Sequence, residues 1–281
     1  MDKKPSFSII IPTYNRKQFL KIAVDSVLKQ TYPNYELIIV DDGSNDSTEK
    51  FIKSYKNPKI NYYYQQNKGP ASARNLGIRK AKGEFICFLD SDDRFRTDKL
   101  KISYRYIKEN PGHKIFHSEE IWYRNGKFLS QKKEHKKPNG FIFKNAAKLC
   151  SISISTAVIK KEVFKKIGNF DQNLLACEDY DFWLRVTSQY PVCLIPETLT
   201  IKEGGHKDQQ SRKYPAMDKF RIYALDKILQ TKNLKKEQYQ IAYQQLQNKC
   251  SVYIKGAALR KKTKEVKKYK DLLNKHEKLY R

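Results

Sequence analysis

The chain contains no long hydrophobic run. Its longest apolar stretch, residues 7–11, is interrupted by Ser8 and is far shorter than the roughly 20 residues that a membrane-spanning helix needs. We also expect no secretory signal, because the first five residues lead directly into this short run. The sequence therefore predicts neither a membrane span nor export.

Cysteine is scarce as well. The five cysteines are odd in number, widely spaced and without a Cys-x-x-Cys pair, which excludes a disulfide scaffold and a zinc finger. We interpret them as small buried hydrophobic residues in a reducing, cytoplasmic protein. They are Cys87, Cys150, Cys177, Cys193 and Cys250.

Acidic residues are few compared with basic ones. The 281 residues include 57 Lys and Arg but only 30 Asp and Glu, so the net charge is +27. The hydrophobic fraction of 39% and aromatic fraction of 12% are sufficient for a core, in one large domain or two small ones. The charge admits nucleic acid, an anionic membrane surface or a phosphorylated substrate as a partner.

The first hundred residues alternate between strand-like and helical periodicity. This alternation predicts an α/β fold with a mostly parallel sheet and helices on both faces. Polar clusters follow three strands at 12–16, 41–47 and 90–93, at the edge where such sheets bind ligands. The predicted strands are 6–11, 35–40, 60–64 and 84–89, and the predicted helices are 19–27, one capped at Asn45 or Ser47, and 70–80.

The rest of the chain has a more mixed pattern. Residues 131–137 read as a basic, mobile loop, and residues 215–281 as a helical appendage in which 216–281 carry 18 basic and 6 acidic residues. We therefore divide the chain into a domain of residues 1–214, with halves 1–110 and 111–214, and an extension of residues 215–281. Further predicted strands are 114–123, 127–129, 153–159 and 192–195, and further predicted helices are 161–167 and 178–188.

Three carboxylates lie within four residues in Asp90-Ser91-Asp92-Asp93, directly after an apolar run. Like charges this close repel unless a cation lies among them. Mg²⁺ or Mn²⁺ accepts such oxygens and can link them to a substrate diphosphate. The alternative is a solvated turn that caps a helix beginning near Lys99.

A second polar cluster, Asp41-Asp42-Gly43-Ser44, would open onto the same edge of the sheet. A carboxylate there can accept a hydrogen bond from a nucleobase imide, and Tyr14 can place its ring against the base. Arg74, in a helix that begins with small residues, can pair with phosphate or with a site carboxylate. The alternatives are an ordinary turn and an ordinary surface arginine.

A third acidic cluster, Glu178 and Asp179, begins the helix predicted over 178–188. A carboxylate at this end can act as general base towards an acceptor hydroxyl. The alternative is simple complementarity with the helix dipole. His206, which follows two glycines, is either a metal-binding imidazole or a plain polar residue.

Together these motifs resemble glycosyltransferase family two, an inverting, metal-dependent family with the Rossmann-like GT-A fold, and in particular its bacterial cell-surface polysaccharide members. The resemblance covers about residues 5–205. The matching segments are residues 8–16, 30–32, 40–44, 69–77, 83–84, 88–93 and 178–185.

The resemblance implies a role for each motif residue. Asp92 is implied as the main ligand of Mn²⁺ or Mg²⁺, Asp90 lies nearer the ribose, and His206 is a further ligand. Asp179 is implied as the catalytic base, with Glu178 as the fallback. The implied nucleotide contacts are Pro12, Tyr14, Arg16, Asp41, Asp42, Arg74 and Asp90.

The implied activity is transfer of a sugar, with inversion, from a nucleotide-sugar donor, by default UDP-linked, to a hydroxyl of a saccharide or lipid-linked acceptor. It needs one base and one cation at the leaving diphosphate, and the sequence offers one cluster for each. The basic extension predicts attachment to an anionic membrane surface from the cytoplasmic side. The alternatives are a basic nucleic-acid-binding protein, a nucleotidyltransferase on a similar sheet and a family-two fold without activity.

Overall fold

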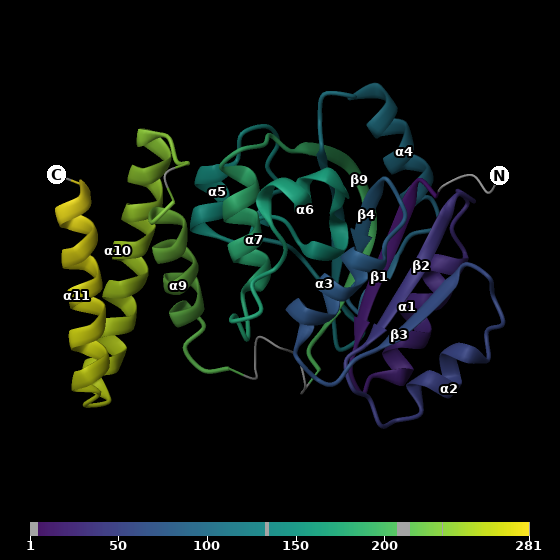
Figure 1. The fold of residues 1–281 in the computed structure, drawn as a ribbon, viewed down its shortest axis with the longest axis horizontal. Helices are drawn as coiled ribbons and strands as arrows, with labels where there is room; N and C mark the ends of the chain where they lie inside the picture. Colours follow the sequence, from purple (N-terminus) through teal and green to yellow (C-terminus); the bar gives the residue numbers. More distant parts are fainter. Residues whose placement is uncertain (1–4, 133–134, 207–213, 232, 281) are drawn as a thin grey trace.

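The structure is a computed structural model that describes residues 5–132, 135–206, 214–231 and 233–280 (Figure 1). Strands and helices alternate through the first half of the chain, as the periodicity predicts. These elements are β1 (Phe7–Thr13), α1 (Lys17–Leu28), β2 (Tyr35–Asp41), α2 (Thr48–Lys53), β3 (Ile60–Tyr64), α3 (Pro70–Lys80), β4 (Phe85–Phe88), β5 (Arg94–Phe95) and α4 (Lys99–Glu109).

The second half mixes short strands with helices. Its elements are β6 (Ile115–Arg124), β7 (Lys127–Leu129), α5 (Phe143–Lys148), the 3₁₀ turn η2 (Ile154–Thr156), β8 (Val158–Lys160), α6 (Glu162–Ile167), α7 (Glu178–Thr187) and β9 (Cys193–Gly204). Three further helices follow in the described part of the chain. They are α9 (Asp218–Leu229), α10 (Lys236–Leu259) and α11 (Thr263–Tyr280).

One sheet connects the two halves, with strand order β3-β2-β1-β4-β8-β6-β9-β5 and with β7 paired to β6. The first four strands are parallel. Beyond β4 the sheet is mixed, because β8 runs antiparallel to both β4 and β6, whereas β9 runs parallel to β6. The predicted parallel arrangement therefore holds for the half that contains the first two acidic clusters.

Helices cover both faces of the parallel strands, as predicted. Along β1, Ile10 packs into a core on one face, and Ile9 and Ile11 pack into a second core on the other. This alternation is the two-residue period of a strand that is buried on both sides. Gly77 lets α3 lie directly on β1, since a Cβ atom there would be 2.4 Å from the Ile10 side chain.

The predicted strand over 153–159 is wrong in its first half, where the chain forms η2 instead. Polar contacts explain the turn. The Ser155 hydroxyl accepts a hydrogen bond from the Asp90 amide at 3.1 Å, and the Thr156 carbonyl accepts one from the buried Lys99 ammonium at 3.1 Å. A regular strand would not present both groups in these directions. The predicted strand 192–195 is also too short, because β9 continues to Gly204.

The interpretation of 131–137 as a basic, mobile loop is wrong for Lys137, while 133–134 lie outside the described residues. The Lys137 side chain is buried, and its ammonium lies 2.7 Å from Glu120 on β6. The Ser153 hydroxyl donates to the same carboxylate oxygen at 2.8 Å. Pairing is what makes burial of two charges tolerable, so this end of the loop is anchored to the sheet.

The C-terminal helices pack beside the half formed by residues 111–214. A core joins α9 and α10 to α5 and α7 through residues that include Tyr180, Leu225 and Leu246. In Figure 1 these helices form one end of the molecule, opposite β3 and α2. Across the described ranges, the helices do not combine the length and hydrophobicity needed to cross a membrane.

Candidate active site

The first two acidic clusters lie at the carboxyl ends of the parallel strands. Asp41 is the last residue of β2, and the loop from Asp90 to Asp93 follows β4. Strands β1, β2 and β4 are adjacent and parallel, so their ends lie at one edge of the sheet. This edge is where α/β sheets of this kind bind ligands.

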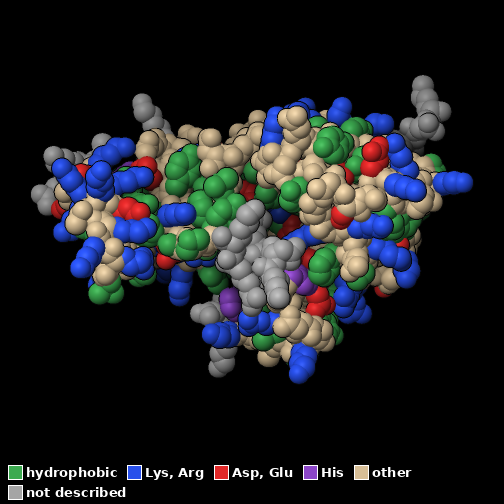
Figure 2. All heavy atoms as spheres, turned by 90° about the horizontal axis from the view of Figure 1, so that it is seen from below, with side chains coloured by type: hydrophobic (Ala, Val, Ile, Leu, Met, Phe, Trp, Pro, Cys, Tyr) green, Lys and Arg blue, Asp and Glu red, His purple; other side chains and the backbone are tan. Residues whose placement is uncertain are grey.

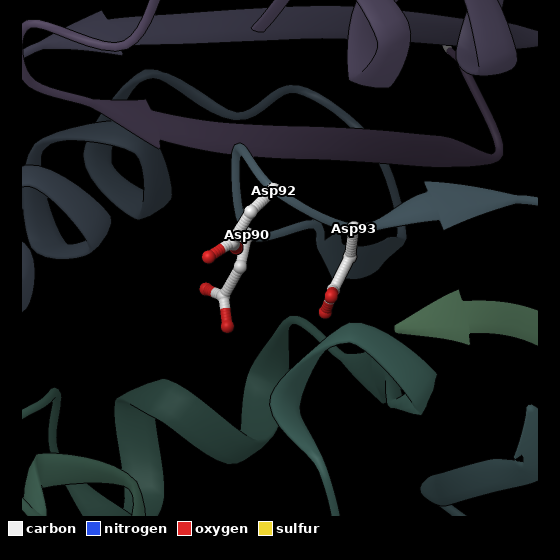
Figure 3. Close-up of side chains that lie close together, drawn as sticks. All are labelled: Asp90, Asp92 and Asp93. Atoms are coloured by element: carbon white, nitrogen blue, oxygen red, sulfur yellow. The ribbon is translucent and has the colours of Figure 1, made fainter. Parts of the chain in front are cut away.

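The carboxylates of Asp90, Asp92 and Asp93 form a compact cluster (Figure 3). One oxygen from each lies within 4.8 Å of the others. Burial, followed by the charge of Asp90, raises the pKa of Asp92. The buried Oδ2 of Asp93 has no hydrogen-bond partner in the described part of the chain. Carboxylate oxygens grouped in this way are the ligands that a hard divalent cation prefers.

Two nitrogen-bearing side chains, those of Arg16 and His206, lie beside Asp92. The Arg16 guanidinium is 3.0 Å from its Oδ2, and His206 Nε2 is 3.7 Å from the same atom. The His206 ring packs on Phe19 of α1, with 4.4 Å between ring centroids. The structure therefore brings His206 to the predicted metal cluster and places Arg16 against the carboxylate implied as the main ligand.

Lys202 of β9 is the site residue that sequence analysis missed. Burial alone lowers the pKa of Lys202, but the carboxylates of Asp93, Glu120, Asp90 and Asp92 outweigh it and raise that pKa. The next residue along, Glu203, donates its amide hydrogen to Asp93 at 3.3 Å. No motif marks Lys202, because its role depends on β9 lying beside the loop that follows β4 and not on its sequence neighbours.

Arg74 of α3 links the first and third acidic clusters. Its guanidinium donates to Glu178 at 2.5 Å and to Asp90 at 2.7 Å. The side chain is buried, so the alternative of an ordinary surface arginine is wrong. Burial raises the pKa of Asp90, but the positive charges of Arg74, Lys202 and Arg16 together outweigh burial, and the pKa is lowered. One buried arginine thus holds the two clusters together and contributes to the lowered pKa of Asp90.

The two acids at the start of α7 have different surroundings. Glu178 is buried against Arg74, and burial raises its pKa despite that partner. Asp179 is partly exposed, and accepts hydrogen bonds from the Cys150 thiol at 3.3 Å and the Tyr180 amide at 2.8 Å. Cys177, just before them, has a left-handed backbone conformation with φ of 61°. Of the two carboxylates, Asp179 is the more accessible to an acceptor.

Asp41 and Asp42 are both buried and engaged in hydrogen bonds. Asp41 accepts from the Ser44 amide at 2.8 Å and the Tyr62 hydroxyl at 2.7 Å. Asp42 accepts from Gln65 at 2.6 Å and from the amides of residues 68 and 69 at 2.9 and 2.8 Å. Asp42 therefore fixes the loop that leads into α3 and its Arg74.

Pro12 and Tyr14 lie next to these acids. Pro12 is buried near the end of β1, whose last residue, Thr13, is in register with Asp41. Tyr14 follows directly and is 46% exposed. A ring that leaves the sheet at this edge with half of its surface in solvent is available to a planar ligand.

Known proteins similar to this chain are glycosyltransferases. The family model described as Glycosyl transferase family 2 matches residues 8–168. A protein of Haemophilus influenzae named an uncharacterized glycosyltransferase is 31% identical over 276 residues, which are 93% of this chain and 92% of that protein. The Escherichia coli UDP-Glc:alpha-D-GlcNAc-diphosphoundecaprenol beta-1,3-glucosyltransferase WfgD is 32% identical over 183 residues, which are 64% of this chain and 68% of that protein.

Several relatives are much longer than the segment that this chain matches. The chain spans 26% of the length of a Rickettsia bellii relative and 35% of a Rickettsia conorii relative, both named uncharacterized glycosyltransferases. The likeness to these proteins therefore concerns one part of each.

Solved structures show the fold. S. aureus TarS 1-349 in complex with UDP-GlcNAc superposes with a TM-score of 0.71 at 22% identity, covering 86% of this chain and 70% of that chain. The mannosyltransferase PcManGT from Pyrobaculum calidifontis, in complex with GDP-Man and Mn²⁺, gives 0.62 at 16% identity, covering 97% and 87%.

These likenesses confirm the predicted GT-A fold, a curled mixed sheet between layers of helices. The family model covers more than half of the chain, from β1 to the end of α6, and one relative matches almost from end to end. The chain belongs to glycosyl transferase family 2.

Proposed function

We propose that this chain is an inverting glycosyltransferase that moves a sugar from a nucleotide-sugar donor to a hydroxyl of a saccharide or lipid-linked acceptor. One observation carries the proposal, namely that the Arg74 guanidinium contacts both Glu178 and Asp90. The acids at the start of α7 and those after β4 therefore face one space. Transfer requires a base for the acceptor and charge stabilisation for the leaving diphosphate, and these two clusters supply the residues for each.

Asp179 is the proposed general base. It is partly exposed and carries no ion pair within the described residues, whereas Glu178 is held by Arg74. A carboxylate that accepts the proton of an acceptor hydroxyl must be accessible and ionised when that hydroxyl attacks. We therefore assign Glu178 to positioning, because its bond to Arg74 fixes the start of α7 relative to Asp90.

We propose that Asp92 and Asp90 bind Mn²⁺ or Mg²⁺, with His206 at the edge of the same site. The cation would supply positive charge to the departing phosphate oxygens. The three clustered carboxylates and the unpartnered oxygen of Asp93 support the assignment. Lys202 adds a fixed positive charge to this cluster, so the site is partly neutralised by the chain itself.

The nucleotide would occupy the edge formed by β1 and β2. Tyr14 offers an exposed ring for the base, beside Pro12 and the buried carboxylates of Asp41 and Asp42. Arg16 lies between this edge and Asp92, in a position to contact the diphosphate. The TarS complex contains UDP-GlcNAc, which supports a UDP-linked donor here.

We propose that residues 111–214 form the half of the catalytic domain that binds the acceptor. Residues 215–281 would then be a basic extension of that domain. The acceptor in the WfgD name is a saccharide on diphosphoundecaprenol, which supports a lipid-linked acceptor and a role in cell-surface polysaccharide synthesis. Such an acceptor would place the enzyme at the cytoplasmic face of a membrane. The predicted alternatives, nucleic-acid binding and nucleotidyl transfer, have no comparable support.

Release of nucleoside diphosphate tests the function. The full chain would be incubated with UDP-, GDP- and dTDP-linked sugars, with and without Mn²⁺, and with saccharide or lipid-linked acceptors. We expect one donor to release its diphosphate only when both an acceptor and Mn²⁺ are present. We expect the Asp179→Asn variant to release almost none from the same donor. Diphosphate release that Asp179→Asn leaves intact would refute the assignment of the base, and transfer of a nucleotidyl group would refute the function itself.

A further inference from the structure

We propose that the end of the α10–α11 hairpin binds the surface of an anionic phospholipid bilayer and so holds the active site against the membrane. The surface in question, the tip surface, consists of Val252, Leu259, Arg260, Lys261 and Lys262. The binding itself is independent of the chemistry of the site, whereas its use for a lipid-linked acceptor rests on the proposed function.

The tip surface exposes two apolar side chains that do not pack into the cores. Leu259 is 86% exposed and Val252 is 64% exposed, two turns earlier on α10. Residues seven apart lie on one face of a helix, so the two side chains form a short apolar stripe. Elsewhere in the described parts of α10 and α11, apolar side chains of this size are buried or partly buried, among them Leu246, Cys250 and Tyr269. The stripe is therefore a feature of this end and not of the hairpin as a whole.

Basic residues surround the stripe. Arg260, Lys261 and Lys262 follow Leu259 directly, and Lys261 has a left-handed backbone conformation with φ of 55° that turns the chain into α11. Glu265 compensates part of this charge, since it lies 3.3 Å from Lys262. Arg260 has no ion pair within the part of the chain that the structure describes. A basic cluster beside an exposed leucine is the composition of an interfacial membrane contact.

A series of contacts connects the tip surface to the segment that precedes the acids of α7. A cleft lined by Met217 and Arg221 of the α9 region and by Val252 and Arg260 joins the start of α9 to the end of α10. Phe220 in turn packs on Leu174 and Ala176, in the segment that leads to Glu178 and Asp179.

The pictures agree with this chain of contacts. In Figure 1 the connection between α10 and α11 and the beginning of α9 are both at the lower side. Figure 2 looks at that side and shows Lys and Arg side chains at the end formed by the C-terminal helices, as over the rest of this face, with some hydrophobic side chains among them.

The chemistry of the tip favours a bilayer over other anionic partners. Phospholipid headgroups attract the cations, while the acyl region accepts Leu259 and Val252. Nucleic acid offers the same attraction but no apolar layer, and would gain nothing from the exposed leucine. The region around the tip is also basic, because residues 216–281 include 18 basic and 6 acidic residues, and this charge favours an anionic surface.

Vesicle flotation tests the proposal with the full chain. The vesicles contain equal parts of phosphatidylglycerol and phosphatidylcholine, or phosphatidylcholine alone. We expect binding to the anionic vesicles only, weakened by salt. Reversing Arg260, Lys261 and Lys262 to Glu together should lower the partition coefficient by about 100-fold. Leu259→Asp should lower it about tenfold, although it changes a single charge.

Matched controls separate the tip surface from general charge. Changing Lys82, Lys101 and Lys108 to Glu makes the same charge change at exposed positions, one just before β4 and two in α4. Ile22→Asp makes the same apolar-to-acid change on α1, where Ile22 is 50% exposed. We expect both to retain most of the binding. If they reduce it as much as the tip variants do, or if the tip variants bind like the parent, the proposal is wrong.

The same variants distinguish this proposal from the proposed function. Diphosphate release with a soluble acceptor should be unchanged in the tip variants, because the tip surface does not touch the catalytic acids. If the full chain does not float with anionic vesicles but still releases diphosphate, only the proposed membrane binding is wrong. If the chain binds anionic vesicles but is inactive with every donor, only the proposed transferase function is wrong.

Discussion

The Arg16 guanidinium and the Asp92 carboxylate, 76 residues apart in the sequence, lie 3.0 Å from each other. Asp92 is the carboxylate proposed as the main ligand of a divalent cation. Arg16 therefore places an internal positive charge where the cation would bind. Because the contact is an ion pair with both side chains mostly buried, its loss is an energetic cost of cation binding.

Arg16→Met should increase the affinity for Mn²⁺ in the absence of nucleotide by roughly tenfold, since one competing charge is removed. The same variant should bind UDP more weakly, because the proposed diphosphate contact is lost as well. Titration of Mn²⁺ followed by electron paramagnetic resonance measures the first effect without activity. Weaker Mn²⁺ binding in Arg16→Met would contradict the competition.

Asp92→Ala should abolish transfer and remove the part of nucleotide binding that depends on Mn²⁺. The cluster would keep Asp90, but Arg74 already holds that carboxylate at 2.7 Å. Calorimetric titration of UDP with and without Mn²⁺ gives the measurement. Asp46→Ala is the control, because Asp46 also lies in a loop after a strand but contacts Thr48 and the amide of Lys17. Metal-dependent binding that survives in Asp92→Ala would exclude this ligand.

Asp179→Asn should lower kcat by about 10²- to 10⁴-fold while the affinity for the donor stays within a few-fold, because a general base acts on the acceptor in the transition state. Glu178→Gln should instead lower thermal stability, since it leaves the buried Arg74 with one carboxylate partner fewer. Steady-state kinetics and thermal unfolding of both variants separate the roles. An active Asp179→Asn enzyme beside a folded but inactive Glu178→Gln enzyme would exchange them.

Acid should destabilise the fold through His117. This side chain is fully buried in β6, and burial, followed by the charge of Lys137, lowers its pKa to about 4 from an ordinary value near 6.5. Between these pH values the unfolded chain binds a proton that the folded chain does not. The free energy of unfolding should therefore fall by about 3 kcal/mol from this group as the pH drops from 6.5 to 4.

Denaturant unfolding between pH 7 and pH 4 measures this loss. In His117→Gln the slope should be shallower, since Gln can still donate to the Pro138 carbonyl, 2.8 Å from Nε2, but does not titrate. The variant should be less stable than the parent at pH 7 and closer to it at pH 4. An unchanged pH slope would show that His117 does not titrate in this range.

The local sequence was sufficient for elements and motifs whose cause is local. Strand β3 (Ile60–Tyr64) and helix α3 (Pro70–Lys80) have the predicted bounds, because β-branched and aromatic runs favour strands and proline after glycine favours the start of a helix. The first two acidic clusters could also be placed, since each follows a strand and parallel strands end at one edge.

The tertiary structure decided which charged groups meet. Arg74 donates a hydrogen bond to Glu178, which is 104 residues away in the sequence. Lys137 is buried against Glu120, and Lys202 of β9 interacts electrostatically with the Asp90 cluster. Each contact depends on the order of strands in the sheet, in which β8 inserts between β4 and β6. Periodicity records how one segment buries its own apolar side chains. It does not record which segment lies beside it, and the stability of a buried charge depends on that neighbour.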